Sequence, residues 1–332
     1  VGSLFVWSTV TYLMGYADSF QELYWLRALM GISEALYIPS ALSLIADWHQ
    51  GKSRSLAIGI HMTGLYVGQA VGGFGATIAA TFSWHSTFHW FGIIGIAYSL
   101  ILMFALRENP AHNIKKTNIP INNTEKKISL FSGLSVLFST WAFWIILFYF
   151  AAPSLPGWAT KNWLPTLFSE TLNIPMSEAG PISTITIAVS SFIGVIVGGI
   201  LSDRWVQKNI RGRVYTGAIG LGMTIPALML LGFGESFMAV VGAGLLFGIG
   251  FGIFDANNMP ILCQFISAKY RGTAYGIMNM TGVFAGAAVT EQLGKWTDGG
   301  NLGIGFALLS IVVLAALLLQ VYFLRPKTDN ME

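Results

Sequence analysis

Two stretches of this chain repeat each other and decide its fold: GKSRSLAIGIHMTGLYVGQA at 51–70 and AKYRGTAYGIMNMTGVFAGAA at 268–288. Both begin with K-x-R and later carry M-T-G, so that Arg54 aligns with Arg271. Chance is one explanation, because glycine-rich membrane helices produce G-x-x-x-G pairs by composition alone. The shared K-x-R and M-T-G favour the other explanation, a duplicated unit, as in many transporter folds.

The composition indicates a membrane protein. Hydrophobic residues make up 54% of the 332 residues, and charged residues only 10%, against about 25% in soluble domains. The chain therefore has too little charge to cover a surface that faces water. The 38 glycines suit close helix–helix approach in lipid. A single cysteine, Cys263, excludes a disulfide within the chain.

The hydrophobic segments predict an all-α integral membrane protein. A spanning helix needs about 20 mostly apolar residues. Ten segments qualify: 1–17, 24–46, 55–81, 86–106, 134–155, 179–201, 212–233, 237–262, 272–294 and 303–324. The stretch 156–170 is expected to prolong the fifth segment after a break between Pro153 and Gly157.

The repeat sets the expected domain organisation. The matched segments are the third and ninth of the chain, so the repeat unit has six helices, and ten of twelve helices are expected here, four plus six. Two helices are expected to be missing before Val1. The predicted parts are an incomplete N-terminal bundle at 1–106, a cytoplasmic linker at 107–133, a C-terminal six-helix bundle at 134–324 and a cytoplasmic tail at 325–332.

The basic residues predict the orientation. Fifteen of the eighteen lysines and arginines fall in the linker, in alternate turns and in the tail; Arg27, Lys161 and Lys295 are the exceptions. Cytoplasmic loops carry such an excess, so the C-terminus is predicted to be cytoplasmic. Because the chain starts within an apolar run with no basic leader, no signal peptide is expected. The expected location is the cytoplasmic (inner) membrane.

Several motifs resemble the major facilitator superfamily. GGILSDRW followed by KNIRGR, at 198–213, looks like its cytoplasmic signature, and RALMGISEA, at 27–35, looks like the R-x-x-x-G element of its fourth helix. The glutamate seven residues after that arginine, NWLPTLF at 162–168 and NNMPILCQFISAKYRGTAYGIMN at 257–279 resemble the anion:cation symporter branch. This branch carries hexuronates, aldonates, sialic acid and organic phosphates. One departure is the looser spacing between Arg204 and Arg211.

The resemblance implies a secondary transporter with the major facilitator fold, which moves an organic anion together with protons by alternating access. A sugar acid (hexuronate, aldonate or sialic acid) is the expected substrate. The expected partners are this small anion, protons and the lipid bilayer, with no nucleic acid, no cofactor and a monomeric state. No P-loop, Cys/His cluster or nucleophile–base arrangement suggests an enzyme. A uniporter or exchanger of a sugar or organic anion without proton coupling, or a transporter-like nutrient sensor, are the alternatives.

The element at 27–35 holds the main coupling candidates. Arg27, Gly31 and Glu34 share one helix face at i, i+4 and i+7. Arg27 and Glu34 are separated by about 10 Å along the axis, at 1.5 Å per residue. We expect Arg27 to bind or organise a carboxylate and Glu34 to take up and release the proton, with Tyr37 one turn further as a hydrogen-bond partner. A polar lock between helices is the alternative role.

Other polar residues within the spans are further substrate-binding candidates, each with interhelical packing as its alternative role. They are His61, Tyr66, Gln69, Asp255, Asn257, Asn258 and Asn279.

Lys161 and Asn162 follow the expected break and are predicted to attract an anion in the outer vestibule. The alternative is an interfacial lysine flanked by Trp158 and Trp163 as aromatic anchors. His85 and His89 have a possible metal-ligand spacing, but without a third ligand they are interpreted as interface histidines and no metal is expected.

The 198–213 motif provides a predicted cytoplasmic gate. In the resemblance it helps to latch the cytoplasmic side of the outward-open state. Positive-inside topology alone would explain the basic residues, but not an aspartate preceded by paired glycines. The predicted gate residues are Gly198, Gly199, Asp203, Arg204, Arg211 and Arg213.

Overall fold

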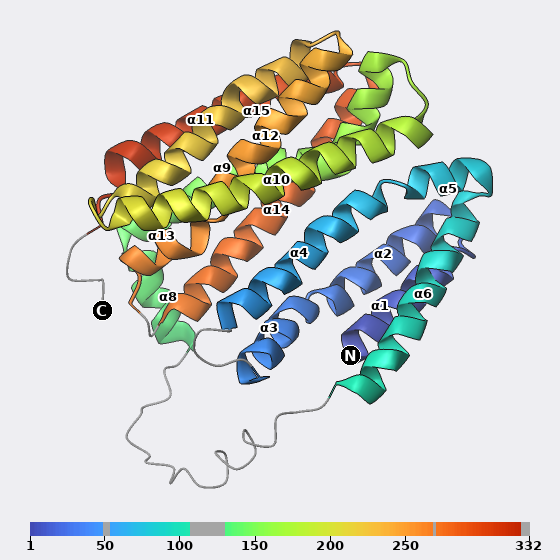
Figure 1. Ribbon diagram of the computed structural model, residues 1–332, viewed down its shortest axis with the longest axis horizontal. Coiled ribbons are helices and arrows are strands. Elements are labelled where there is room, and N and C mark those ends of the chain that lie inside the picture. The colour runs from blue at the N-terminus through green and yellow to red at the C-terminus, as the bar shows by residue number, and fades with distance from the viewer. Residues whose placement is uncertain (49–53, 107–129, 268–269, 327–332) are drawn as a thin grey trace, which may run out of the picture. The chain divides into compact units, whose positions relative to one another are not determined.

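The computed structural model describes residues 1–48, 54–106, 130–267 and 270–326, and every regular element in these ranges is a helix (Figure 1). The chain divides into two compact units, Val1–Gly68 with Phe74–Lys126, and Gln69–Gly73 with Lys127–Glu332. The boundary between Lys126 and Lys127 falls inside the predicted linker, whereas Gln69–Gly73, at the end of the predicted span 55–81, is grouped with the second unit. Residues 107–129 and 327–332 lie outside the described ranges, so the predicted limits of linker and tail stay predictions.

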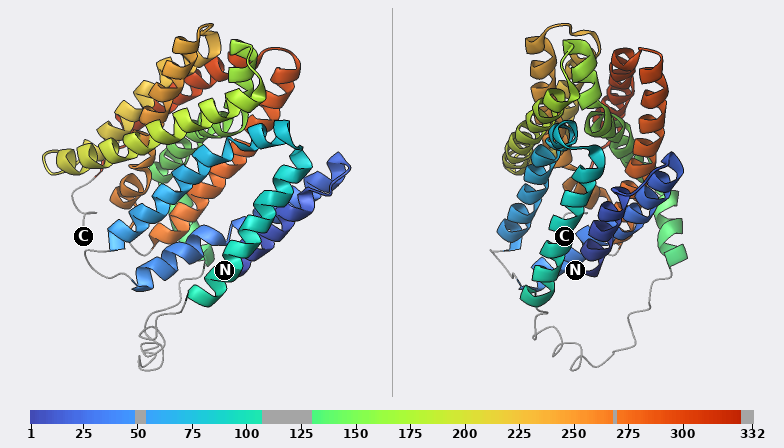
Figure 2. Two further views of the ribbon diagram at one scale, coloured as in Figure 1. Left: turned by 45° about the vertical axis from the view of Figure 1, so that its right-hand side comes forward. Right: turned by 90° about the vertical axis from the view of Figure 1, so that its right-hand side faces the viewer.

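The first unit is built on a close pair of helices, α1 and α6, with α2 beside α1 (Figures 1 and 2). A Cβ atom on Gly92 of α6 would lie 2.5 Å from the Tyr12 backbone nitrogen, so only glycine permits this approach. The helices of this unit are α1 Gly2–Met14, α2 Phe20–Glu34, α3 Tyr37–Trp48, α4 Arg54–Gly72, α5 Gly75–Thr81 and α6 Trp84–Ala105.

The second unit is a bundle of longer helices. Its members are α8 Leu130–Ser139, α9 Trp141–Leu172, α10 Met176–Val206, α11 Gly212–Phe233, α12 Phe237–Asp255, α13 Asn258–Phe265, α14 Arg271–Asp298 and α15 Leu302–Phe323. Within it, α12 packs along α10 and α11, α15 along α11, and α14 along α9. Large aromatic side chains fill its core, among them Phe143, Tyr149, Phe168, Phe247 and Phe306.

The helices confirm a multi-pass membrane architecture. Six helical stretches in the described ranges are long and apolar enough to cross a bilayer. Four of the ten predicted spans differ from the prediction because each is divided into two helices. The span 24–46 is divided at Ala35 and Leu36, 55–81 at Gly73 and Phe74, 134–155 at Thr140, and 237–262 at Ala256 and Asn257.

The predicted break between Pro153 and Gly157 is wrong: α9 continues through Pro153, Pro156 and Pro165. Each proline removes one helical N–H. Side chains engage carbonyls along this stretch, with the Ser154 hydroxyl donating to Phe150 O at 2.7 Å and that of Thr160 to Gly157 O at 3.0 Å. Packing against α14 and α15 also supports the helix. The break lies instead at Thr140, between α8 and α9.

Two of the helix breaks have the same local sequence and the same hydrogen bonds. GISEALYIP at 31–39 and GIFDANNMP at 252–260 share G-I-x-(E/D)-A-x-x-x-P. In each, the alanine N–H donates to the carbonyl of the glycine four residues earlier, at 3.1 Å. The next helix then begins two residues before the proline, where a missing N–H is tolerated. Glu34 and Asp255 are thus the last residues of α2 and α12.

The helix starts agree with the internal repeat. α4 begins at Arg54 and α14 at Arg271, the two arginines that the repeat aligns. The Arg271 guanidinium donates to the carbonyls of Cys263 and Ile266, both at 3.0 Å, and so ties the start of α14 to the end of α13.

A pair of adjacent glycines on α10 tests the packing of this bundle. A Cβ on Gly198 would lie 2.7 Å from the Ile253 Cα of α12, whereas a Cβ on Gly199 would meet nothing within 4 Å. Gly198→Ala should therefore destabilise the protein by about 1–3 kcal/mol through overpacking. Gly199→Ala should be neutral or stabilising by up to about 1 kcal/mol, because alanine favours helix.

The measurement is the unfolding temperature of the purified protein in detergent, with both variants compared in parallel. Equal unfolding temperatures for the two variants would contradict the close α10–α12 contact.

Candidate functional site

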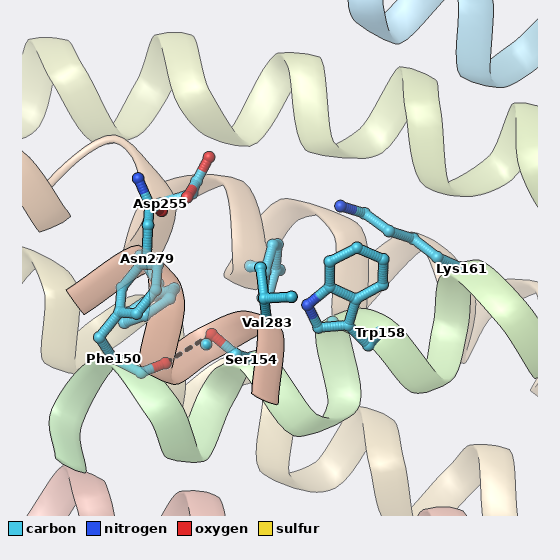
Figure 3. A pocket seen from close by; sticks show the side chains of 11 residues that line it. Phe150, Ser154, Trp158, Lys161, Asp255, Asn279 and Val283 are labelled. Atoms are coloured by element: carbon cyan, nitrogen blue, oxygen red, sulfur yellow. Dashed lines mark hydrogen bonds between the residues drawn. The ribbon is translucent and has the colours of Figure 1, made fainter. Parts of the chain in front are cut away.

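A cavity of about 200 Å³ lies inside the second unit, between α9, α12 and α14. We call it the Lys161 cavity. Figure 3 shows Asp255 and Asn279 near one end of it, and Trp158 and Lys161 near the other. The residues that line it are Phe150, Ser154, Gly157, Trp158, Lys161, Phe251, Phe254, Asp255, Asn279, Gly282 and Val283.

Helix periodicity explains which side chains reach the cavity. The α9 residues follow a spacing of four, three, one and three from Phe150 to Lys161, which is one helix face. From α12 and α14 the lining positions are again three or four residues apart. Phe150, Ser154 and Trp158 were missed as cavity residues, because the assumed break hid this face. If residues 150–161 are read as one continuous helix, their spacing predicts this face.

Lys161 brings a positive charge to the cavity. Its Nζ lies 4.9 Å from the centre of the Trp158 ring, a cation–π contact. The ring packs on Gly286 of α14, where any side chain would collide with it. Among the described residues no carboxylate forms an ion pair with this ammonium. Its charge is therefore available to a ligand.

Asp255 brings a negative charge from the end of α12. Its Oδ1 accepts a hydrogen bond from the Asn258 amide at 3.1 Å, and within the described ranges Oδ2 has no protein partner. Asn279 of α14 and Ser154 of α9 add neutral polar groups to the walls. The cavity therefore offers an ammonium and, on other helices, acceptors and donors of hydrogen bonds.

This arrangement suits binding of a small polar molecule. The volume is below the roughly 300–1,000 Å³ typical of pockets for drug-sized ligands. Over the part of the chain that the structure describes, no three His, Cys, Asp or Glu side chains gather as metal ligands. His85 stacks on Trp84 with ring centres 3.6 Å apart, and His89 contacts Tyr16 at 4.4 Å.

Lys161, Asp255 and Asn279 are the predicted candidates that the structure brings together here. Asn257 and Asn258, expected to line a cavity, are instead buried: the Asn257 amide donates to Ile253 O at 2.8 Å, and that of Asn258 to Asp255. They hold the chain at the break between α12 and α13, whose free backbone groups need partners. Asn162 also points away from the cavity, because its amide donates to the Thr290 hydroxyl of α14 at 2.8 Å.

In the first unit, Arg27 and Glu34 are exposed on α2. Tyr37, at the start of α3, contacts the Trp7 ring edge-on at 5.2 Å between ring centres and the His61 ring in a tilted arrangement at 5.8 Å. Tyr66 and Gln69 are half-buried on α4.

The predicted gate residues lie around the turn between α10 and α11. Asp203 and Arg213 form an ion pair at 3.7 Å, and the Arg211 guanidinium donates to the Val321 carbonyl near the end of α15. Gly198 packs against Ile253, while Gly199 and Arg204 face open space. Arg211 and Arg213 therefore fasten the turn to its own bundle.

The Major Facilitator Superfamily matches residues 1–290. The chain belongs to this superfamily. A bacterial homologue of the human lysosomal transporter Spinster, solved in an inward-facing and occupied conformation, has the same fold. The TM-score is 0.74 at 17% identity, over 99% of this chain and 82% of the other.

Curated relatives in the superfamily are similar over most of this chain. "Probable anion transporter 3, chloroplastic" of Oryza sativa subsp. japonica is 26% identical over 92% of this chain and 62% of its own length. "Sodium-dependent phosphate transport protein 1, chloroplastic" of Arabidopsis thaliana is 24% identical, over 92% and 63%. "Probable sulfoacetate transporter SauU" of Cupriavidus necator is 23% identical, over 93% and 76%. The chain thus spans about three fifths of the length of the two plant relatives. All three are named as transporters.

The cavity predicts which positions of α14 water-soluble reagents reach. In a Cys263→Ser background, Val283→Cys should react quickly with a charged methanethiosulfonate reagent, because Val283 lines the cavity and is 56% exposed. Met278→Cys, at a position 0% exposed on the same helix, should react slowly. The measurement is the labelling rate of each variant by mass spectrometry. Similar rates for both thiols would argue against an open cavity at this place.

Proposed function

We propose that this protein is a secondary transporter that moves a small organic anion across a membrane by alternating access, with a sugar acid as substrate and the proton as coupling ion. The observation that carries the proposal is the Lys161 ammonium, which borders a cavity inside the helix bundle and forms no ion pair with a carboxylate among the described residues. The proposed membrane is the cytoplasmic one, with the C-terminus inside, on the strength of the basic turns.

The charge of Lys161 supports an anionic substrate. A lysine in a membrane-spanning helix costs roughly 2.5–3.5 kcal/mol on insertion scales, and such residues commonly mark a substrate pathway. Trp158 compensates part of this cost, and an anion bound in the cavity would compensate more through a charge-assisted hydrogen bond. The names of the relatives quoted above, which include anion, phosphate and sulfoacetate transporters, support the same class.

A sugar acid fits the remaining walls. Asp255 and the Asn279 carbonyl can accept hydrogen bonds from hydroxyl groups, and the Asn279 amide can donate. The Trp158 ring offers an apolar face for C–H groups. The small volume favours a molecule with few carbon atoms over a bulky anion.

For coupling we propose Glu34, a carboxylate in the first unit on the same helix face as Arg27. An anion held by Arg27 on the same helix face would change the proton affinity of Glu34, which links substrate and proton. The gate residues Asp203, Arg204, Arg211 and Arg213 would open and close the cytoplasmic side, with Gly198 and Gly199 beside them. Sodium coupling is the competing possibility, because one relative is named as sodium-dependent.

Substitution of Lys161 tests the anion site. Lys161→Gln should raise the KM for sugar-acid uptake by roughly tenfold to a hundredfold, because a hydrogen bond to a charged group contributes about 1.5–3 kcal/mol. Lys161→Arg keeps the charge and should retain more activity.

The measurement is uptake of labelled glucuronate and gluconate into proteoliposomes that contain the intact protein. The matched control is Lys295→Gln, since Lys295 pairs with Glu291 at 2.6 Å and does not line the cavity. A KM unchanged by Lys161→Gln would refute the proposed anion site.

Substitution of Glu34 tests the coupling. Glu34→Gln removes the titratable group, so accumulation driven by an imposed pH gradient should be lost while exchange of internal for external substrate continues. Glu22→Gln, at the start of the same helix, is the control and should keep accumulation.

The two gradients separate the alternatives. Accumulation that follows a sodium gradient and does not depend on a pH gradient would show that sodium, and not the proton, is the coupling ion. Accumulation that persists in Glu34→Gln would show that Glu34 is not the coupling residue.

A further inference from the structure

We propose that Asp255 is a specificity-determining residue that makes the Lys161 cavity select monocarboxylates with hydrogen-bond donors at their far end and reject dianions. The proposal rests on the proposed transport of organic anions. It assigns a role to a negatively charged side chain in the site, whereas binding of anions alone would require only positively charged side chains.

The carboxylate of Asp255 is held in position but remains open to a ligand. Its Oδ1 accepts from the Asn258 amide at 3.1 Å, and Asn258 itself is buried with 4% of its surface exposed. Oδ2 has no hydrogen-bond partner among the described residues, and the side chain lines the cavity. A carboxylate oxygen in this situation needs a donor, either water or a hydroxyl of the substrate.

Asp255 and Lys161 do not form a direct ion pair. The ammonium lies over the Trp158 ring, and the two charged groups come from different ends of the cavity (Figure 3). A structural ion pair would join them directly, and none is formed between them. The cavity therefore keeps a separate positive and negative pole, with Asn279 on the wall near the negative one.

The charge balance then discriminates between ligands. Lys161 and Asp255 are the charged residues that line this cavity, so its formal charge is zero when it is empty. A monocarboxylate places its charge on Lys161 and its hydroxyl groups at Asp255. A dianion of the same length must bring its second carboxylate to Asp255, where two like charges meet. Specificity of this kind comes from repulsion built against the wrong ligand.

Asp255 lies at a helix break that has a counterpart in the first unit. It ends α12 at the break that repeats the one after Glu34, with the same G-I-x-(E/D)-A-x-x-x-P sequence. An acidic residue therefore stands at the same structural place in each unit. The carbonyl end of α12 disfavours a further negative charge there, so a carboxylate at this position is costly and its presence calls for a role.

The test compares gluconate with glucarate, which share one carbon chain and differ by a second carboxylate. The intact protein in proteoliposomes takes up labelled gluconate, and unlabelled gluconate and glucarate compete. In the wild type, gluconate should compete better by roughly tenfold or more, the effect of one like-charge contact. Asp255→Asn should bring the two acids to within about threefold, while Asp255→Glu should keep the preference.

The control is Glu291→Gln, which removes a carboxylate from α14 outside the cavity and should leave the ratio unchanged. Monodisperse elution from a sizing column checks the fold, and if Asp255→Asn fails it, Asp255→Ser replaces it. Gluconate uptake with a ratio that Asp255→Asn does not change would overturn the role of Asp255 but leave the proposed transport standing. A preference of the wild-type protein for glucarate would also overturn the role of Asp255. Absence of uptake of any organic acid would refute the proposed function, and the role of Asp255 with it.

Discussion

A lysine ammonium on a membrane-spanning helix is costly unless it is compensated, and among the described residues no ion pair does this for Lys161. The Trp158 ring does so in part, and the position of that ring depends on its surroundings. Gly286 leaves room for the indole, while the Asn162 amide and the Trp163 indole N–H both donate to Thr290, at 2.8 and 3.1 Å. The α9–α14 contact thus supports a charge that would otherwise destabilise the bundle.

Glycine contacts explain how the rest of the second unit keeps its shape around a cavity. α12 meets α10 and α11 at backbone-to-backbone distances that any side chain would block, as at Gly220 and Gly250, where a Cβ on either would lie within 2.7 Å of the other's carbonyl oxygen. Such contacts hold helices by van der Waals packing without bulky side chains. The face of α12 toward α9 and α14 instead brings Phe251, Phe254 and Asp255 to the Lys161 cavity.

Composition and hydrophobic patterning were sufficient to predict the membrane class, and the motifs at 27–35 and 198–213 were sufficient to predict the superfamily. They were insufficient where prolines had to be interpreted. Pro153 and Pro156 suggested a break, yet neighbouring helices hold α9 straight enough to continue, whereas Pro39 and Pro260 do follow breaks. The difference lies in tertiary packing, which local sequence does not contain. The same limit affected the asparagines: Asn257 and Asn258 are polar residues next to Asp255 in sequence, but only the structure shows that they are buried at a helix break.

The two matched breaks have a mechanical consequence. Asp255 belongs to α12, and its hydrogen-bond donor Asn258 is the first residue of α13. The two half-helices meet at a joint of only two residues, so any tilt of α13 against α12 must lengthen or shorten the bond between these side chains. Movement of α13 would then change how firmly the Asp255 carboxylate is held and how strongly it needs another hydrogen-bond donor. A movement of α13 would thereby change the affinity of the Lys161 cavity for its ligand through this one hydrogen bond.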